Sequence, residues 1–284
     1  MKFASVIALF LFASYSHALE LTPSWSLNGF EKPESVIYDS NSESYYVSNI
    51  VGMALDKDNN GYISRLDKDG NRIQQKWIEG MSAPKGMAIH NRYLYVSDID
   101  TLVKINLTTA TIEQRYIADG AKFLNDVAVD KDGYVYVSDM FDNRIYRLAN
   151  GQFDSWLASD ELQSPNGLTV INNQLIVGSW GVLSEGFATS TKGHMLRINL
   201  QTKAIQSQGP QSEIGNIDGV EFDGNKGYWI TDWMAGRVIH VTDHKAELIL
   251  QLKQGSADIG IRQDIQQITV PMMLEGTVHA YQWK

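Results

Sequence analysis

The chain has 284 residues, and its 33 acidic side chains outnumber its 24 lysines and arginines, which gives a formal net charge of −9. This acidity argues against a nucleic-acid partner, because the phosphate backbone attracts basic surfaces. The absence of cysteine excludes disulfides, thiolate-bound zinc, iron–sulfur clusters and cysteine nucleophiles, and a hydrophobic content of 43% excludes a disordered chain.

Residues 1–18 have the three regions of a secretory signal peptide. Lys2 supplies the positive charge, residues 6–13 form a short apolar core, and residues 16–18 form a small-x-small cleavage site. We therefore expect cleavage after Ala18 and a mature protein that is periplasmic or secreted. No later stretch is long and apolar enough for a membrane helix, so no membrane span is expected.

A repeated unit occupies most of the remaining chain. Each repeat opens a short apolar strand with a charged or amide residue, which we call the marker. The six markers are Glu34, Lys85, Asn125, Asn166, Asp218 and, in a weaker repeat, Asp258. The intervals between successive markers are 51, 40, 41, 52 and 40 residues. This spacing, with apolar residues alternating along short strands, is typical of the blades of a β-propeller.

A second strand follows the marker in every repeat. These strands lie at 45–49, 95–98, 136–139, 176–180, 229–232 and 268–271. We predict an all-β protein in which residues 19–284 form a single domain, a six-bladed β-propeller. The sixth repeat is short, so the strand-like segment 21–27 is expected to close the last blade and remove an exposed edge. Recurring Ser/Thr-Asp pairs at the ends of second strands indicate a structural role, bonding backbone between blades.

The markers are expected to meet in space, because the first strand of each propeller blade lines the central channel. A position held by packing alone would be apolar in every repeat, whereas each marker is charged or an amide. Two carboxylates about 5 Å apart repel each other by roughly 3 kcal/mol, and a divalent cation would cancel that charge. The predicted oxygen ligands, which suit calcium first and magnesium second, are Glu34, Asn125, Asn166 and Asp218. An alternative is a polar network around water, with Lys85 paired to Glu34 or Asp258.

Short motifs around the markers resemble those of the senescence marker protein/gluconolactonase family, and the chain is also similar to NHL-like propellers. The motifs are Pro-Glu-Ser-Val at 33–36, Leu-Asn-Asp-Val at 124–127, Pro-Asn-Gly-Leu at 165–168 and Asp-Gly-Val at 218–220. The family consists of six-bladed propellers and includes calcium-dependent lactonases. The resemblance implies metal ligands at Glu34, Asn125, Asn166 and Asp218, with Asp218 also a general base beside Asp126. The arginine with which the family often binds sugar acids has no counterpart at 121–124.

These observations predict an exported calcium-dependent hydrolase of lactones or esters that acts on a small molecule, with the cation as Lewis acid. Asp218 or Asp126 would accept a proton from the attacking water, and Lys85 would stabilise the oxyanion or hold the product carboxylate. Two alternatives stay open. One is a non-catalytic binding propeller with a structural cation, and the other is a strictosidine-synthase-like propeller that works without metal. A monomer is assumed.

Four further features flank the predicted channel. Trp180 and Trp233 follow second strands, where they form either an aromatic rim or packing between blades. The insertion 183–193 in the fourth repeat is either a lid over the channel mouth or a long loop. The acidic loop 56–67 has ligand spacing close to that of an EF-hand but no flanking helices, so a hairpin connection is favoured over a second calcium site.

Overall fold

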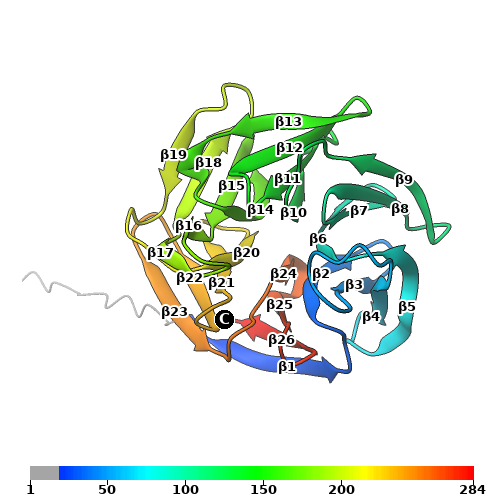
Figure 1. Ribbon diagram of the computed structural model, residues 1–284. Helices are drawn as coiled ribbons and strands as arrows, with labels where there is room; N and C mark the ends of the chain where they lie inside the picture. The colour runs from blue at the N-terminus through cyan, green and yellow to red at the C-terminus, as the bar shows by residue number, and fades with distance from the viewer. Residues whose placement is uncertain (1–18) are drawn as a thin grey trace, which may run out of the picture.

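The computed structural model describes residues 19–284, which are all-β apart from two short 3₁₀ helices, η1 (Asp160–Leu162) and η2 (Gln263–Ile265). The predicted signal peptide lies outside the described residues. Six four-stranded antiparallel sheets surround a central channel (Figure 1), which confirms the predicted six-bladed β-propeller. Neither helical segment of this part of the chain has the length and hydropathy that crossing a bilayer requires.

The first three blades run from the channel outward in chain order. Blade 1 consists of β2 (Pro33–Asp39), β3 (Ser44–Asn49), β4 (Gly61–Asp67) and β5 (Arg72–Met81). Blade 2 consists of β6 (Pro84–His90), β7 (Tyr93–Asp98), β8 (Thr101–Asn106) and β9 (Thr111–Ile117). Blade 3 consists of β10 (Leu124–Val129), β11 (Val135–Asp139), β12 (Arg144–Ala149) and β13 (Gln152–Ala158).

The fourth blade contains the predicted insertion, and the fifth returns to the simple pattern. Blade 4 consists of β14 (Pro165–Ile171), β15 (Gln174–Ser179), β18 (Met195–Asn199) and β19 (Ile205–Gln208). Between β15 and β18 the chain forms a separate hairpin of β16 (Gly181–Leu183) and β17 (Thr189–Lys192). Blade 5 consists of β20 (Ile217–Phe222), β21 (Tyr228–Asp232), β22 (Arg237–Val241) and β23 (Ala246–Gln251).

The sixth blade joins the two ends of the described chain. Its strands, from the channel outward, are β24 (Gly260–Arg262), β25 (Gln267–Met272), β26 (Thr277–Trp283) and β1 (Leu21–Asn28). β1 pairs with β26 along its whole length, from Leu21 opposite Trp283 to Asn28 opposite Thr277. The predicted closure by the N-terminal strand is therefore confirmed. The inner strand begins two residues after Asp258, so the sixth marker precedes its strand instead of lying within it.

The hydrophobic core lies between neighbouring blades. One buried cluster, for example, joins Tyr95 and Leu102 of blade 2 to Val127 and Val137 of blade 3. Both faces of a blade are covered in this way, which is why a second strand such as β11 is buried at every position. Each such apolar side chain contributes roughly 1.5–3 kcal/mol by its burial, so the ring is stabilised around its whole circumference.

The Ser/Thr-Asp pairs hold the inner strands in place. In blade 3, Asp139 Oδ1 accepts a hydrogen bond from the backbone N–H of Phe123, just before β10, at 2.9 Å. Ser138 Oγ accepts from the N–H of Asp126 at 2.9 Å and donates to the carbonyl oxygen of Asn166 in blade 4 at 2.8 Å. The aspartate thus ties down the entry to the inner strand, and the hydroxyl connects adjacent blades, which agrees with the predicted structural role.

Candidate functional site

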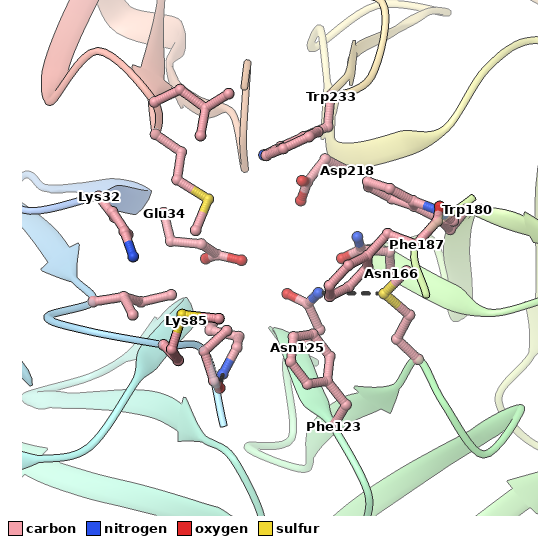
Figure 2. Close-up of a pocket in the computed structure, with 16 residues that line it drawn as sticks. Lys32, Glu34, Lys85, Phe123, Asn125, Asn166, Trp180, Phe187, Asp218 and Trp233 are labelled. Carbon is pink, nitrogen blue, oxygen red and sulfur yellow. Dashed lines mark hydrogen bonds between the residues drawn. The ribbon is translucent and has the colours of Figure 1, made fainter. Parts of the chain in front are cut away.

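A pocket of about 260 Å³ opens at the end of the channel where the inner strands begin. Figure 2 shows its polar floor and its largely apolar wall. The floor contains five of the six markers, which are Glu34, Lys85, Asn125, Asn166 and Asp218. The wall includes Met53, Phe123, Trp180, Phe187, Trp233 and Leu274. The structure therefore brings the four predicted ligands together with Lys85.

A β-bulge accompanies each of the five markers that line the pocket. In β10 the cross-strand register shifts between Leu124 and Val127, across the marker and the residue after it. The same shift occurs in β2, β6, β14 and β20. A bulge removes a residue from the regular alternation of a strand and redirects its side chain. The sequence signal that could have predicted it is the glycine that follows the marker in blades 2, 4 and 5, namely Gly86, Gly167 and Gly219.

These glycines also allow the inner strands to approach one another. A Cβ atom on Gly167 would lie 2.2 Å from the carbonyl oxygen of Asp218, and one on Gly219 would lie 2.2 Å from the backbone nitrogen of Ile259. Any larger residue at these positions would push neighbouring blades apart. The close approach keeps the floor narrow, so that markers from separate blades share one space.

Three oxygen atoms of the floor are buried and receive no hydrogen bond from any of residues 19–284: Glu34 Oε2, Asn166 Oδ1 and Asp218 Oδ1. Their side chains come from blades 1, 4 and 5 and are only 5%, 1% and 5% exposed. In Figure 2 the polar ends of these side chains and of Asn125 point toward one common space. A buried acceptor without a donor costs about 1–3 kcal/mol, so three at one point indicate a place for a ligand.

Burial raises the pKa values of the carboxylates at the floor. Burial, followed by the negative charges of Asp218 and Asp258, raises the pKa of Glu34 well above its usual value. Burial and then the charge of Asp258 raise the pKa of Asp218 in the same direction. A positive ligand in the common space would stabilise both ionised forms, because an opposite charge offsets desolvation.

Lys85 lies at the edge of the floor and is fully buried. Its ammonium donates to the carbonyl oxygens of Ala83 at 2.9 Å and Ala54 at 3.3 Å, rather than to Glu34 or Asp258. It also stands over the ring of Phe123, 4.6 Å from the centroid. Burial lowers the pKa of Lys85 to about 8. Because an ammonium has three donors, one N–H remains for a ligand in the pocket.

Asp126 and Asp258, in contrast, do not line the pocket. Asp126 Oδ1 accepts from the N–H of Val127 and its Oδ2 from the N–H of Leu168 in blade 4, both at 2.6 Å. Asp258 Oδ2 accepts from the hydroxyl of Ser35 at 2.5 Å. The expectation that six markers meet therefore holds for five, and Asp126 lies between blades 3 and 4 instead of in the pocket.

The chemistry of the floor fits a hard divalent cation. Among residues 19–284, no three His, Cys, Asp or Glu side chains are grouped for a metal, and the predicted set contains only two acids. The remaining donors are the amide oxygens of Asn125 and Asn166. Carboxylate and amide oxygens together are the usual ligands of calcium, and the three unpartnered oxygens are the atoms that a cation would engage.

An aromatic cluster forms one side of the pocket wall. The ring of Phe187 lies 5.9 Å from that of Phe123, 5.4 Å from that of Phe141 and 6.1 Å from that of Trp180. Trp180 lies 6.0 Å from Trp233. The two tryptophans thus form a rim, one of the two roles considered for them. Phe187 was not predicted, although it lies in the insertion that interrupts the spacing of the repeats.

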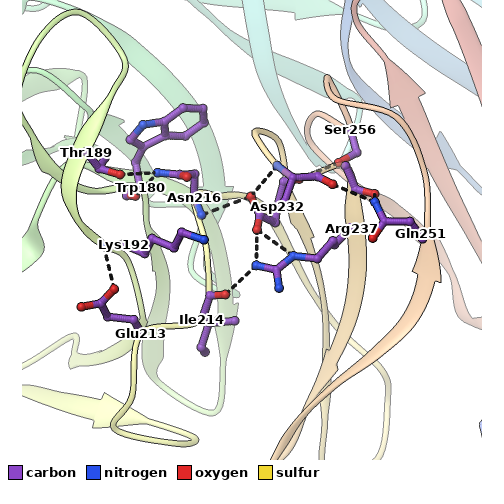
Figure 3. Close-up of polar contacts among 12 residues, drawn as sticks. Trp180, Thr189, Lys192, Glu213, Ile214, Asn216, Asp232, Arg237, Gln251 and Ser256 are labelled. Carbon is purple, nitrogen blue, oxygen red and sulfur yellow. Dashed lines mark hydrogen bonds and ion pairs between the residues drawn. The ribbon is translucent and has the colours of Figure 1, made fainter.

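Polar contacts tie the β16–β17 hairpin to blade 5 (Figure 3). The side-chain amide of Asn216 donates to the carbonyl oxygen of Trp180 at 2.9 Å and to Thr189 Oγ1 at 3.0 Å. The indole of Trp180 donates to the carbonyl oxygen of Phe187 at 2.9 Å. Asn216 directly precedes β20, which carries Asp218, so the hairpin wall and the acidic floor are held by the same segment. The insertion is therefore a hairpin at the mouth of the pocket that is hydrogen-bonded to the segment before β20.

No protein-family model and no curated protein sequence matches the chain. Three of the solved structures that resemble it share its fold. A candidate gluconolactonase has a TM-score of 0.68 and 16% identity, over 96% of this chain and 94% of that one. Streptogramin B lyase has a TM-score of 0.63 and 13% identity, over 94% and 98%. An inactive variant of virginiamycin B lyase from Staphylococcus aureus, with quinupristin, has a TM-score of 0.62 and 15% identity, over 93% and 99%. Identities this low show the propeller fold alone.

Proposed function

We propose that this chain is an exported hydrolase of lactones or esters that depends on a divalent cation, calcium in the first place. The observation that carries the proposal is the set of three unpartnered buried oxygens, from Glu34, Asn166 and Asp218, at the floor of a pocket open to small molecules. Asn125 lies beside them and would add a fourth oxygen. When bound there, the cation would supply Lewis-acid polarisation of the substrate carbonyl.

The remaining steps belong to side chains of the chain itself. Asp218 accepts a proton from the attacking water, whose oxygen forms a bond to the acyl carbon as the bond to the leaving oxygen breaks. The leaving alkoxide then takes that proton. The remaining N–H of Lys85 stabilises the developing oxyanion or holds the product carboxylate. Asp126 has both oxygens engaged by backbone N–H groups, so we assign it to positioning β14 next to Asn166.

Metal analysis and hydrolysis assays test the proposal together. We expect the purified mature protein to contain calcium and to cleave lactones or aryl esters, with chelation lowering the rate by roughly 1,000-fold, or about 4 kcal/mol. Glu34→Gln and Asp218→Asn should lose both the metal and the activity. Glu185→Gln, at an exposed position of the hairpin outside the pocket wall, is the matched control.

Two results would contradict the assignment. Full hydrolysis by either floor variant would show that the unpartnered oxygens do not serve the reaction. Bound calcium with no turnover of any lactone or ester would indicate the binding-propeller alternative, in which the cation is structural.

A further inference from the structure

We propose that the pocket selects substrates that carry an apolar tail, and that Phe187 is the residue that selects for the tail. This inference rests on the proposed function and narrows its substrate class. The ligand is a lactone or ester with an alkyl or aryl substituent of medium length, rather than a polyhydroxylated sugar lactone. The polar ring would lie on the floor, and the tail would lie along the aromatic wall.

The first argument is the contrast between floor and wall. Apart from Lys32, which also lines the pocket, the charged and amide groups are concentrated at the floor, whereas the wall presents rings and sulfur atoms from blades 1, 3, 4, 5 and 6 (Figure 2). Hydroxyl groups placed against Phe123, Trp180 and Phe187 would lose water without gaining partners, which costs free energy. An alkyl or aryl group in the same place gains by leaving water.

The second argument is the exposure of apolar side chains at the mouth. Three side chains that line the pocket are far more exposed than core residues: Met53 at 66%, Leu274 at 58% and Phe187 at 44%. They come from three separate connections, β3–β4, β25–β26 and β16–β17. Apolar side chains that encircle a concave opening are covered when a ligand fills it, so their exposure points to an apolar occupant.

The volume of the pocket indicates that its ligand is a small molecule. Its volume of about 260 Å³ is close to the lower end of the range of about 300–1,000 Å³ for small-molecule sites. A six-membered lactone ring with a short alkyl chain suits this space, whereas a protein segment does not enter it.

Phe187 is suited to discrimination because its position is held from two sides. Its ring contacts Phe123, Phe141 and Trp180, and its carbonyl oxygen accepts from the indole of Trp180. Asn216 holds Trp180 in turn, from the residue that precedes β20. Because the ring is held in place, it contacts the substituent of a substrate whose lactone ring lies on the floor, and it can therefore distinguish substrates by that substituent.

Three δ-lactones with the same ring give the test. δ-Decalactone carries a pentyl tail, δ-valerolactone has no substituent, and D-glucono-δ-lactone carries hydroxyl groups. We expect kcat/KM for δ-decalactone to exceed that for the other two by about 100-fold, since the pentyl tail leaves water when it lies along the aromatic wall. Phe187→Ala should lower the preference for δ-decalactone over δ-valerolactone by about tenfold. Val182→Ala, on the same hairpin, 41% exposed and outside the pocket wall, should leave the preference unchanged.

Binding without turnover separates this inference from the proposed function. The δ-lactams that correspond to δ-decalactone and δ-valerolactone resist hydrolysis. Their binding is followed by the change in total tryptophan fluorescence, to which Trp180 and Trp233 contribute from the pocket wall. We expect the pentyl lactam to bind about 100-fold more tightly, with Phe187→Ala reducing that difference about tenfold. If no lactone is cleaved but this pattern holds, the hydrolase proposal fails and the apolar-tail inference stands. Preference for D-glucono-δ-lactone, or a tail preference that Phe187→Ala leaves unchanged, overturns the inference.

Discussion

Two adjacent layers of the channel contain buried polar side chains that differ by one residue in sequence. The floor layer consists of the five markers that line the pocket, and the other layer consists of Ser35 and Asp126, which follow two of these markers, together with Asp258. In the floor layer, oxygens of Glu34, Asn166 and Asp218 have no donor. In the other layer, both oxygens of Asp126 accept backbone N–H groups. Burial and charge are common to both layers, so the missing partner is what distinguishes a ligand site from a structural bond between blades.

The largest expected difference between the layers is in the free energy of unfolding, and it should appear when Asp126 is removed. Asp126→Ala leaves the N–H groups of Val127 and Leu168 buried and unpaired, at about 1–3 kcal/mol each, so we expect the free energy of unfolding to fall by about 3 kcal/mol. Asp218→Ala removes a carboxylate whose Oδ1 has no donor, and should change the stability of the chelated protein by less than about 1 kcal/mol. Urea unfolding in the presence of chelator measures both values. Equal losses in the two variants would mean that the layers do not differ.

Cation binding should also distinguish the two layers, because only the floor layer contains the proposed ligands. A ligand that binds only the folded state at about 100 times its Kd stabilises that state by about 2.7 kcal/mol. We expect calcium to raise the unfolding free energy of the wild-type protein by this amount and to leave Asp218→Asn nearly unchanged. Asp126→Asn keeps the floor ligands, so it should retain the calcium-dependent increase even though it starts from a different stability. Calcium titrations followed by thermal unfolding test this, and an undiminished increase in Asp218→Asn would place the cation elsewhere.

A pH-dependent effect is expected from Glu221, a partly buried acid on β20 beyond the marker. Burial, followed by the charge of Asp258, raises the pKa of Glu221 from 4.5 to about 8. Between these pH values the unfolded chain releases the proton while the folded chain keeps it. Rising pH therefore favours the unfolded state, and the free energy of unfolding should fall by up to about 1.4 kcal/mol per pH unit, levelling off above about pH 8.

Glu221→Gln removes this titration, so its stability should depend less steeply on pH across that interval. Urea midpoints of the chelated protein, measured at intervals between pH 5 and about pH 8.5, give the slope. Glu43→Gln, at an exposed position, is the control and should follow the wild-type curve. An unchanged slope in Glu221→Gln would show that this carboxyl is ionised in the folded protein.

The spacing and alternation of the repeats were sufficient to predict the architecture. Six markers at blade-like intervals predicted six sheets, and the short sixth repeat predicted closure by the segment 21–27, which β1 provides. The same register predicted that Glu34, Asn166 and Asp218 would meet, although they are far apart in sequence. This succeeded because equivalent positions of a closed repeat occupy equivalent places around its axis, so a one-dimensional pattern carries three-dimensional information.

Tertiary structure alone decided which polar side chains are free to bind a ligand. Asn125 and Asp126 are neighbours in sequence, but the bulge in β10 directs one toward the pocket and the other toward the N–H of Leu168 in blade 4. It also decided that Phe187, on the hairpin between β15 and β18, completes the wall. Whether a buried oxygen finds a donor depends on the backbone of the neighbouring blade, and a residue pattern along one strand does not contain that information.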